Sequence, residues 1–536
     1  MSGKNKTIAI LTPILFSLTL IIGILIGNSY SKLNDNSLTL YPNTDKLNAV
    51  LSYIEEEYVD TISREELIEE AIPEILKKLD PHSIYIPKKD MSEMNEPLEG
   101  NFDGIGIQFN IQNDTIMVVN TIKGGPSERI GIMAGDRIVE VNDEIVSGIK
   151  IKSDDVVKKL KGTRGSKVKI GIKRKNVKKL LNFNIIRDKI PLESIDIAYM
   201  LTENIGYVKI NKFARTTYEE FITAVADLKA KGMKKIVVDL RGNSGGYMDA
   251  ATNVIDEFLE KGKLIVYTQG RSRPINKTIA SSRESLLQCN VAILIDEWSA
   301  SASEIMAGAI QDNDRGVIIG RRSFGKGLVQ EPTYFSDGSG LRLTIARYYT
   351  PTGRCIQKSY KDGYDNYYKD ISTRYLKGEF SVTDSIDFPD SLKFYTKAGK
   401  VVYGGGGIMP DYFIPVDTQG VTLYLTNVVN HGLIYSFAFK YTDEHRNTFN
   451  KLKSYQQLDK YLDKQNLLND FVEYADKNGI VRNEEDIAKS KTILLTHLKG
   501  FIIRNIFDDE GFYPIIHRTD KTIKKAIKVL NKEKNV

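Results

Sequence analysis

The 536-residue sequence contains little cysteine and little histidine. Its two cysteines, Cys289 and Cys355, cannot form a disulfide framework, and their apolar or strand-like surroundings are typical of buried, unreactive thiols. The histidines leave a long gap, because none lies between residues 83 and 430. A cysteine nucleophile and a Ser-His-Asp triad both need a histidine base, so both are hard to assemble in this span. Clusters with metal-ligand spacing are also missing, and we expect no metal and no other cofactor.

The sequence also lacks a strong excess of charge of one sign. The net charge is +6, lysine and glutamate are mixed along the chain, and no basic stripe with interleaved aromatic residues occurs. These features argue against nucleic acid as a partner. The exception is the segment Lys521 to Lys534, where lysines alternate with apolar residues. It is typical of a solvated terminal helix, and the alternative is a helix that contacts an anionic membrane surface.

A single long uncharged run, Thr7 to Gly27, follows Lys4 and Lys6. About 20 apolar residues span a bilayer as a helix, and the leading lysines favour a cytoplasmic N-terminus. The run ends without a convincing Ala-x-Ala cleavage site. We therefore predict an uncleaved signal anchor, a transmembrane helix within residues 1–30, that attaches the protein to a membrane and leaves the remaining chain exported.

The chain is too long for one hydrophobic core, so several domains are expected. Residues 43–98 carry a helical pattern that is typical of a small helical hairpin, with a role in support or dimerisation. Residues 421–536 become helical and polar again, and their role stays open, including that of an adaptor or a contact in a homo-oligomer. The overall class is a multi-domain α/β protein with helical regions at both ends.

Residues 99–175 change to short strands and resemble a PDZ domain. The resemblance rests on Gly104-Ile105-Gly106-Ile107, on Gly124-Gly125-Pro126 and on Ala134-Gly135-Asp136. It implies that the backbone N–H groups of Gly104, Ile105, Gly106 and Ile107 capture the C-terminal carboxylate of a peptide. The peptide then adds to the neighbouring strand, and apolar end residues are favoured by a pocket that includes Ile105 and Ile107.

Residues 190–420 alternate strands and helices, which predicts an α/β core with a mostly parallel sheet. We interpret the PDZ domain as an insertion in the chain of this core. The predicted strands of this sheet include Lys235 to Leu240, Lys263 to Tyr267 and Val291 to Ile295. Two polar loops follow such strands, and the site of a parallel sheet lies outside the carboxyl ends of its strands. The tyrosine-rich segment Ser359 to Tyr375 has no clear period and is interpreted as an exposed insertion.

The segment Ser299 to Gln330 combines a candidate nucleophile with a candidate base. A serine needs a base to take its proton, and a lysine serves if burial keeps it neutral. That change lowers the lysine pKa from about 10.4 to roughly 7–8. Glycines on both sides of Lys326 allow close packing, and Gln330 can hold the amine through its amide oxygen.

Ser301 is the serine that we choose, at the predicted start of an apolar helix. Taken alone, a serine at this position is explained equally well as a helix cap without a catalytic role. A helix N-terminus also stabilises negative charge, so the N–H of Ala302 is a natural donor to a tetrahedral oxyanion. The second donor is expected from the pair Gly245-Gly246, where a peptide bond can approach closely.

These segments, in this order, resemble the carboxyl-terminal processing (tail-specific) proteases over about residues 45 to 420. The resemblance rests on Leu79-Asp80-Pro81-His82-Ser83, Ser299 to Glu304, Phe324 to Gln330, Arg347-Tyr348-Tyr349-Thr350-Pro351 and Gly407 to Asp411. It implies that Ser301 is the nucleophile, Lys326 the general base and Gln330 its orienting partner, with Ala302 and Gly246 as oxyanion donors. It also implies a PDZ domain that captures substrate tails and that, in many members of the family, gates the active site.

Two other motifs are weaker. The loop Gly242 to Gly246 contains Ser244 and resembles the nucleophile loop of trypsin-like proteases, which need an upstream histidine and aspartate; only His82 is available. The segment Gly320 to Gly327 nearly matches a phosphate-binding loop, but a glycine stands where a serine or threonine binds magnesium.

We therefore expect a membrane-anchored serine endopeptidase of a bacterial cell envelope, with its catalytic part on the extracytoplasmic side of the inner membrane. Its substrates are proteins or peptides with exposed apolar C-termini. The alternative is a catalytically silent PDZ scaffold that only binds peptides, which a hydrated and charged Lys326 would indicate.

Overall fold

The computed structural model describes residues 16–26, 46–112, 114–175, 177–382 and 389–532. By its internal contacts the chain divides into two units, residues 1–78 and 79–536. In the first unit α2 (Lys46–Glu57) and α3 (Arg64–Leu76) form the predicted hairpin. The Arg64 guanidinium joins them by donating to Ser52 Oγ and Asn48 Oδ1, each at 3.1 Å.

Only part of the predicted membrane anchor can be compared with the structure. Residues 16–26 are helical, and the rest of the run lies outside the described residues. Within the described part of the chain, no helix combines the length and the apolar character needed to cross a bilayer. The anchor therefore stays a prediction.

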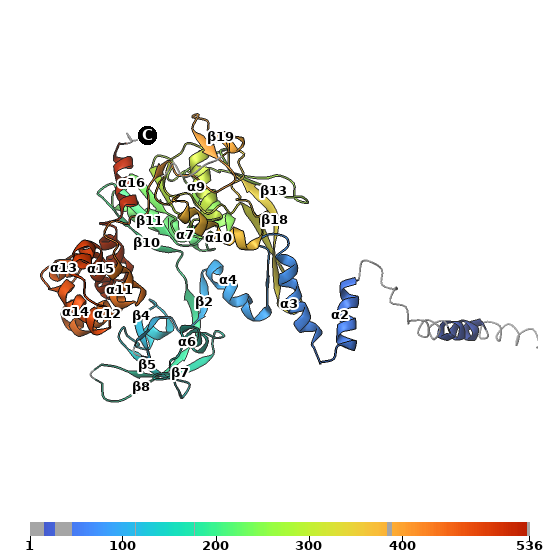
Figure 1. Cartoon of the computed structure of the whole chain (residues 1–536), viewed down its shortest axis with the longest axis horizontal. Helices are drawn as coiled ribbons and strands as arrows, with labels where there is room; N and C mark the ends of the chain where they lie inside the picture. The colour runs from blue at the N-terminus through green and yellow to red at the C-terminus, as the bar shows by residue number, and fades with distance from the viewer. Residues whose placement is uncertain (1–15, 27–45, 113, 176, 383–388, 533–536) are drawn as a thin grey trace, which may run out of the picture. The chain divides into compact units, whose positions relative to one another are not determined.

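The second unit contains the predicted mostly parallel sheet (Figure 1). Its strand order is β10-β11-β12-β15-β16-β21, and only the β10–β11 pair is antiparallel. The strands are β10 (Ile195–Met200), β11 (Ile205–Ile210), β12 (Lys235–Asp239), β15 (Asn290–Ile295), β16 (Val317–Gly320) and β21 (Tyr412–Phe413). The central strands are aliphatic and buried throughout, as expected for a parallel sheet that is covered on both faces.

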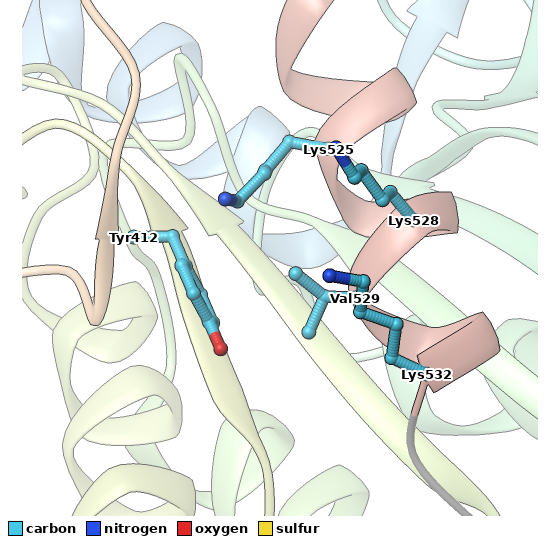
Figure 2. Close-up of a pocket in the computed structure, with 5 residues that line it drawn as sticks. All are labelled: Tyr412, Lys525, Lys528, Val529 and Lys532. Atoms are coloured by element: carbon cyan, nitrogen blue, oxygen red, sulfur yellow. The ribbon is translucent and has the colours of Figure 1, made fainter.

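Different helices cover the two faces of this sheet. On one face Ile236 and Val238 of β12 pack in the core with α7 (Thr217–Ala230), α8 (Met248–Asp256) and α9 (Ala302–Asp312). On the other face Val237 packs against α16 (Lys521–Lys532). The apolar side of α16 is buried on the sheet, and Lys524, Lys528 and Lys532 are exposed. Figure 2 shows Tyr412 and Lys525 facing each other beside this helix, with the Lys525 amine 4.5 Å from the ring centroid.

A second, antiparallel sheet contains the strand after the candidate lysine. Its order is β1-β18-β13-β14, and β17 pairs with β18. Its strands are β1 (Ile84–Ile86), β13 (Leu264–Gln269), β14 (Asn276–Ile279), β17 (Leu328–Tyr334) and β18 (Gly340–Tyr349). The prediction for Lys263 to Tyr267 was therefore right about a strand and wrong about its sheet. A short apolar run looks the same in both kinds of sheet, and only its long-range partner decides.

The PDZ region forms an antiparallel sheet of order β3-β4-β5-β7-β8, with β6 paired to β5. Its elements are β3 (Ile107–Gln112), β4 (Thr115–Thr121), α5 (Pro126–Arg129), β5 (Arg137–Val141), β6 (Glu144–Ile145), α6 (Ser153–Leu160), β7 (Lys167–Lys173) and β8 (Leu181–Ile186). The flanking strands β2 (Asn101–Gly104) and β9 (Asp188–Pro191) pair with each other. Since β1 before the PDZ region pairs with β18 after it, the domain is an insertion in the core.

The remaining described elements are mostly helical. They are η1 (Lys88–Asp90), α4 (Met91–Glu99), α10 (Tyr364–Leu376), η3 (Asp390–Leu392), β19 (Lys393–Tyr395), β20 (Val401–Tyr403), α11 (Leu423–Asn430), α12 (Leu433–Phe449), α13 (Tyr455–Leu462), α14 (Leu467–Lys477) and α15 (Glu484–Ile516). Helices α11 to α15 share one hydrophobic core. The interpretation of residues 359–375 as an exposed insertion was wrong for Tyr367 and Arg374, which α10 buries.

Candidate active site

Ser301 occupies a strained turn at the N-terminus of α9. Its φ of 55° and ψ of −114° lie in a region that residues with a side chain rarely adopt. The turn follows β15, so the serine stands at the carboxyl edge of the parallel sheet, and its side chain is half-buried. The helix that begins at Ala302 directs its free N–H groups and positive dipole end toward the serine.

The two neighbouring serines are engaged elsewhere. Ser299 Oγ donates to the Leu240 carbonyl at 2.8 Å, and Ser303 Oγ donates to the Asn243 carbonyl at 2.9 Å. Both residues are fully buried. These contacts make Ser299 and Ser303 poor candidates for a nucleophile, and Ser301 stays the candidate.

A single buried carboxylate connects the backbones of the candidate nucleophile and the candidate base. Oε2 of Glu304 accepts from the Ser301 N–H at 2.9 Å and from the Lys326 N–H at 2.8 Å. Oε1 accepts from the Gly325 N–H at 2.7 Å and from Ser323 Oγ. Burial raises the pKa of Glu304, and these four hydrogen bonds act against that rise. An acceptor of four donors is best satisfied as the ionised carboxylate.

The hydroxyl of Tyr348 connects the same two backbones from the carbonyl side. It donates to the Lys326 carbonyl at 2.9 Å and to the Ser301 carbonyl at 3.2 Å. Burial raises the pKa of Tyr348 well above its ordinary value, so the phenol stays a neutral donor. Glu304 and Tyr348 together fix the main chains of Ser301 and Lys326 relative to each other.

Lys326 is half-buried. Burial lowers its pKa below the ordinary lysine value; the charges of Asp80 and Glu304 oppose this shift, and those of Arg342 and Lys212 reinforce it. The amine donates to Gln330 Oε1 at 3.2 Å. Among the hydrogen bonds of the described residues none joins Ser301 Oγ to Lys326 Nζ, a looseness that is common in active sites without substrate.

Gln330 is itself held by the segment that precedes the PDZ domain. Its Nε2 donates to the His82 carbonyl, and this fixes which amide atom faces the lysine. The His82 ring lies 2.8 Å from the Tyr367 hydroxyl of α10. Burial, with help from the Lys326 charge, lowers the pKa of His82 to about 3, so the imidazole is neutral at ordinary pH. His82 therefore supports Gln330, which holds the lysine amine, through its backbone carbonyl, and its ring is a weak base.

The glycine pair lies against Ser301. A Cβ added at Gly245 would come within 2.8 Å of the Ser301 Cβ and 3.0 Å of the Ala302 nitrogen, so only glycine fits there. At Gly246 a Cβ would come within 2.1 Å of the Phe213 carbonyl oxygen. The Gly245 N–H already donates to Asn243 Oδ1 at 2.8 Å. In the described part of the chain the N–H groups of Gly246 and Ala302 have no acceptor, which leaves these two for an oxyanion.

In the PDZ domain the residues Gly104 to Ile107 connect β2 to β3. Ile105 is buried in the domain core, and its carbonyl accepts from the Ser127 N–H at 3.1 Å and from Ser127 Oγ at 2.6 Å. Gly106 has a φ of 73°, which favours glycine. Strand β3 pairs with β4 on one side only and stands at the end of its sheet, as the addition of a peptide strand requires.

The comparison with family models assigns three segments of the chain. Residues 204–364 match peptidase family S41, residues 104–185 match the PDZ domain, and residues 424–508 match a family of unknown function. A carboxy-terminal-processing protease of Bartonella bacilliformis is 35% identical over 338 residues, which cover 62% of this chain and 77% of that protein. The chain is a member of the carboxy-terminal processing protease family.

Other relatives of this family agree. The carboxy-terminal processing protease CtpB of Bacillus subtilis is 33% identical over 317 residues, which cover 59% of this chain and 65% of that protein. The chain thus spans just under two thirds of the length of this relative. The solved photosystem II D1 C-terminal processing protease is 24% identical, covers 70% of this chain and 87% of its own, and has a TM-score of 0.36.

The structure thus brings together Ser301, Lys326, Gln330, Ala302 and Gly246, and their roles stay predictions. The sequence alone did not reveal that Glu304 holds the backbones of Ser301 and Lys326, or that the His82 carbonyl holds Gln330. A local signal existed for Glu304, because a serine followed three residues later by glutamate is a capping-box pattern. For His82 no local signal existed, since its contact with Gln330 joins segments far apart in the chain.

Proposed function

We propose that this family member is a serine endopeptidase in which Ser301 attacks and Lys326 takes its proton, and that it cuts exported proteins near their C-termini. One observation carries the proposal. A single buried carboxylate oxygen accepts from the N–H groups of both Ser301 and Lys326, while the lysine amine lies in a site that lowers its pKa. The shared carboxylate fixes the two main chains relative to each other, and the lowered pKa favours the neutral amine that a general base requires.

In the proposed first step a peptide carbonyl lies beside the Ser301 hydroxyl. The neutral Lys326 amine accepts the hydroxyl proton as Oγ bonds to the carbonyl carbon. The negative oxygen of the tetrahedral intermediate accepts from the N–H groups of Ala302 and Gly246. The Lys326 ammonium then returns its proton to the leaving amine, and an acyl-enzyme on Ser301 remains.

The second half of the reaction repeats these roles with water. Lys326 takes a proton from a water molecule that attacks the acyl group, and Ser301 leaves with the proton that the lysine returns. Gln330 holds the amine at 3.2 Å through an acceptor that cannot neutralise its charge. The lysine therefore stays in place in both its neutral and charged forms.

Substrate capture is proposed for the PDZ domain. The free edge of β3 accepts an extended peptide, and the turn at Gly104 to Ile107 receives its terminal carboxylate through backbone N–H groups. Ile107 is partly exposed next to the domain core, which favours an apolar end residue. We also propose that Thr7 to Gly27 anchors the protein in the inner membrane of a bacterial envelope, with the catalytic part outside the cytoplasm.

Cleavage of an unfolded protein with an apolar C-terminal tail tests the activity. Ser301→Ala and Lys326→Ala should each reduce the cleavage rate by at least about 10³-fold, since either removes a member of the reacting pair. Ser299→Ala is the matched control and should retain most of the activity. A serine-directed phosphonate should modify Ser301 in the parent, which peptide mass spectrometry can locate.

Cleavage by both alanine variants at the parental rate would exclude Ser301 and Lys326 as the reacting pair and would make Ser244 the next candidate nucleophile. A parent that binds tails but never cleaves them would support a silent PDZ scaffold instead.

A further inference from the structure

The loop that provides one proposed oxyanion donor has few side chains to hold it. It contains Gly242, Gly245 and Gly246, and all three have positive φ values. Such residues restrain the backbone little, because they lack a Cβ. Within the loop the buried Asn243 side chain accepts from the Gly245 N–H and donates to the Ile210 carbonyl. The other long side chain at the loop is that of Arg241, at its start.

Arg241 lies between two carboxylates from distant parts of the chain. Its Nε and Nη2 donate to Asp239 at the end of β12, with distances of 3.0 Å and 2.6 Å to Oδ2. Its Nη1 donates to Asp520 Oδ2 at 2.8 Å. Burial acts against ionisation of Asp239, yet the charges of Arg241 and Lys209 hold its pKa below the ordinary value. Asp239 thus stays charged, and Arg241 is held from both sides.

Asp520 is rigidly placed by the helix that follows it. Its Oδ1 accepts from the N–H groups of Thr522 at 2.8 Å and of Ile523 at 3.0 Å, so it caps α16. That helix buries its apolar side on the parallel sheet, and the Lys235 amine donates to the Leu530 carbonyl at 2.6 Å. One carboxylate oxygen therefore serves the helix cap, and the other serves Arg241.

We infer that Asp520 is a positioning residue of the active site, acting through Arg241 on the loop that carries Gly246. The inference rests on the proposed function of that loop. Asp520 lies outside the segments matched by the peptidase model and by the family of unknown function. The C-terminal part of the chain thus completes the support of the oxyanion loop, in addition to covering the sheet.

The two roles of Asp520 can be separated by substitution. Asp520→Asn keeps a side-chain oxygen that can cap the helix but loses the negative charge toward Arg241. Asp520→Ser also caps a helix and is too short to reach the guanidinium. The matched control is Asp417→Asn, which removes an exposed carboxylate that pairs with Lys521, the next residue in the chain.

The first measurement is steady-state cleavage of the tail substrate, per active site titrated with the phosphonate. For Asp520→Asn and Asp520→Ser we expect kcat to fall about tenfold, a fraction of the 10²–10³ that loss of an oxyanion donor costs. KM should stay within about twofold, since the oxyanion contact forms only in the transition state. The control should match the parent. A purely structural role would lower the melting temperature and the titratable fraction, but not kcat per active site.

The second measurement needs no activity. Amide hydrogen exchange of the peptide that covers residues 241–247 should be several-fold faster in Asp520→Asn than in the parent and the control. Unchanged exchange and unchanged kcat overturn the inference. If Ser301→Ala still cleaves like the parent, the proposed function fails, and exchange alone then decides the role of Asp520.

Discussion

Ser301 and Lys326 have similar backbone anchors and different side-chain anchors. Both N–H groups donate to Glu304, and both carbonyls accept from Tyr348. The serine hydroxyl then depends on one rotatable bond beyond this frame. The lysine amine depends on a flexible four-carbon chain, whose end is held by Gln330. The candidate nucleophile is thus placed by main-chain contacts, whereas the amine of the candidate base is placed by a series of side-chain contacts.

The different anchors give the two side chains different freedom to move. Hydrogen bonds to the main chain set the relative position of the two residues within narrow limits, because no side-chain torsion of Ser301 or Lys326 lies between these bonds and the backbone. The lysine tip can move without disturbing that frame, so the missing Ser301–Lys326 hydrogen bond can form when substrate enters. Loss of the shared Glu304 carboxylate should therefore harm the reaction more than loss of the Gln330 side chain that holds the lysine amine.

The largest effect is expected at Glu304. Glu304→Gln keeps the shape but places an NH₂ group against N–H donors and removes a buried charge-assisted acceptor. Since a misplacement of about 1 Å costs about 10²-fold, we expect kcat to fall by 10²–10³. Crystal structures and melting temperatures of the variant would show whether the two backbones separate. A loss below about tenfold would contradict the shared-frame interpretation.

Gln330→Ala tests the lysine side of the comparison. It removes the acceptor for the amine, and hydrogen bonds to charged groups contribute about 1.5–3 kcal/mol. We expect kcat to fall about 10- to 100-fold with little change in melting temperature. Gln330→Glu should instead hold the amine but favour its charged form, and so should move the pH profile upward. Equal losses in both variants at all pH values would argue against an orienting role.

Tyr348→Phe removes one hydroxyl from the shared frame and leaves the ring in place. The hydroxyl proton is divided between two carbonyls, and a neutral hydrogen bond contributes about 1 kcal/mol. We therefore expect about a fivefold decrease in kcat, measured against Tyr349→Phe on the same strand as the control. An unchanged kcat would leave Glu304 as the sole link between the two residues.

The smallest effect concerns pH. With Lys326 as the proposed base, the reaction needs the neutral amine, whose fraction rises with pH, so kcat/KM should rise with pH through the lowered pKa of Lys326. The Asp80 charge raises that pKa, so Asp80→Asn should move the rising limb to lower pH. Asparagine keeps an oxygen for the His82 and Ser83 N–H groups, which the Asp80 Oδ1 accepts at 2.8 Å and 2.9 Å. A limb that moves to higher pH, or not at all, would contradict Lys326 as the base.

Elements with a strong local pattern could be predicted from the sequence. The strands predicted at Lys235 to Leu240 and at Val291 to Ile295 are confirmed as β12 and β15, because a continuous aliphatic run is a local property. The PDZ domain is confirmed as well. The sheet assignment of β13 failed because a strand's partners lie far away in the chain.

The same distinction applies to the candidate site. Ser301, Lys326 and the glycine pair are marked by local motifs, so sequence reasoning could name them, although their roles stay to be tested. Tyr367 was missed, since a polar helix gives no sign of the ring that it buries against His82. Asp520 was missed for a similar reason, because its partner Arg241 precedes it by hundreds of residues.

The backbone conformation of Ser301 reduces the stability of the fold. Its positive φ would suit glycine, and the surrounding contacts hold a serine there at a conformational cost of order 1–3 kcal/mol. A sequence optimised only for fold stability would place glycine at this position and lose the hydroxyl of the candidate nucleophile. Fold stability thus favours glycine at position 301, the proposed reaction requires serine, and this chain has serine.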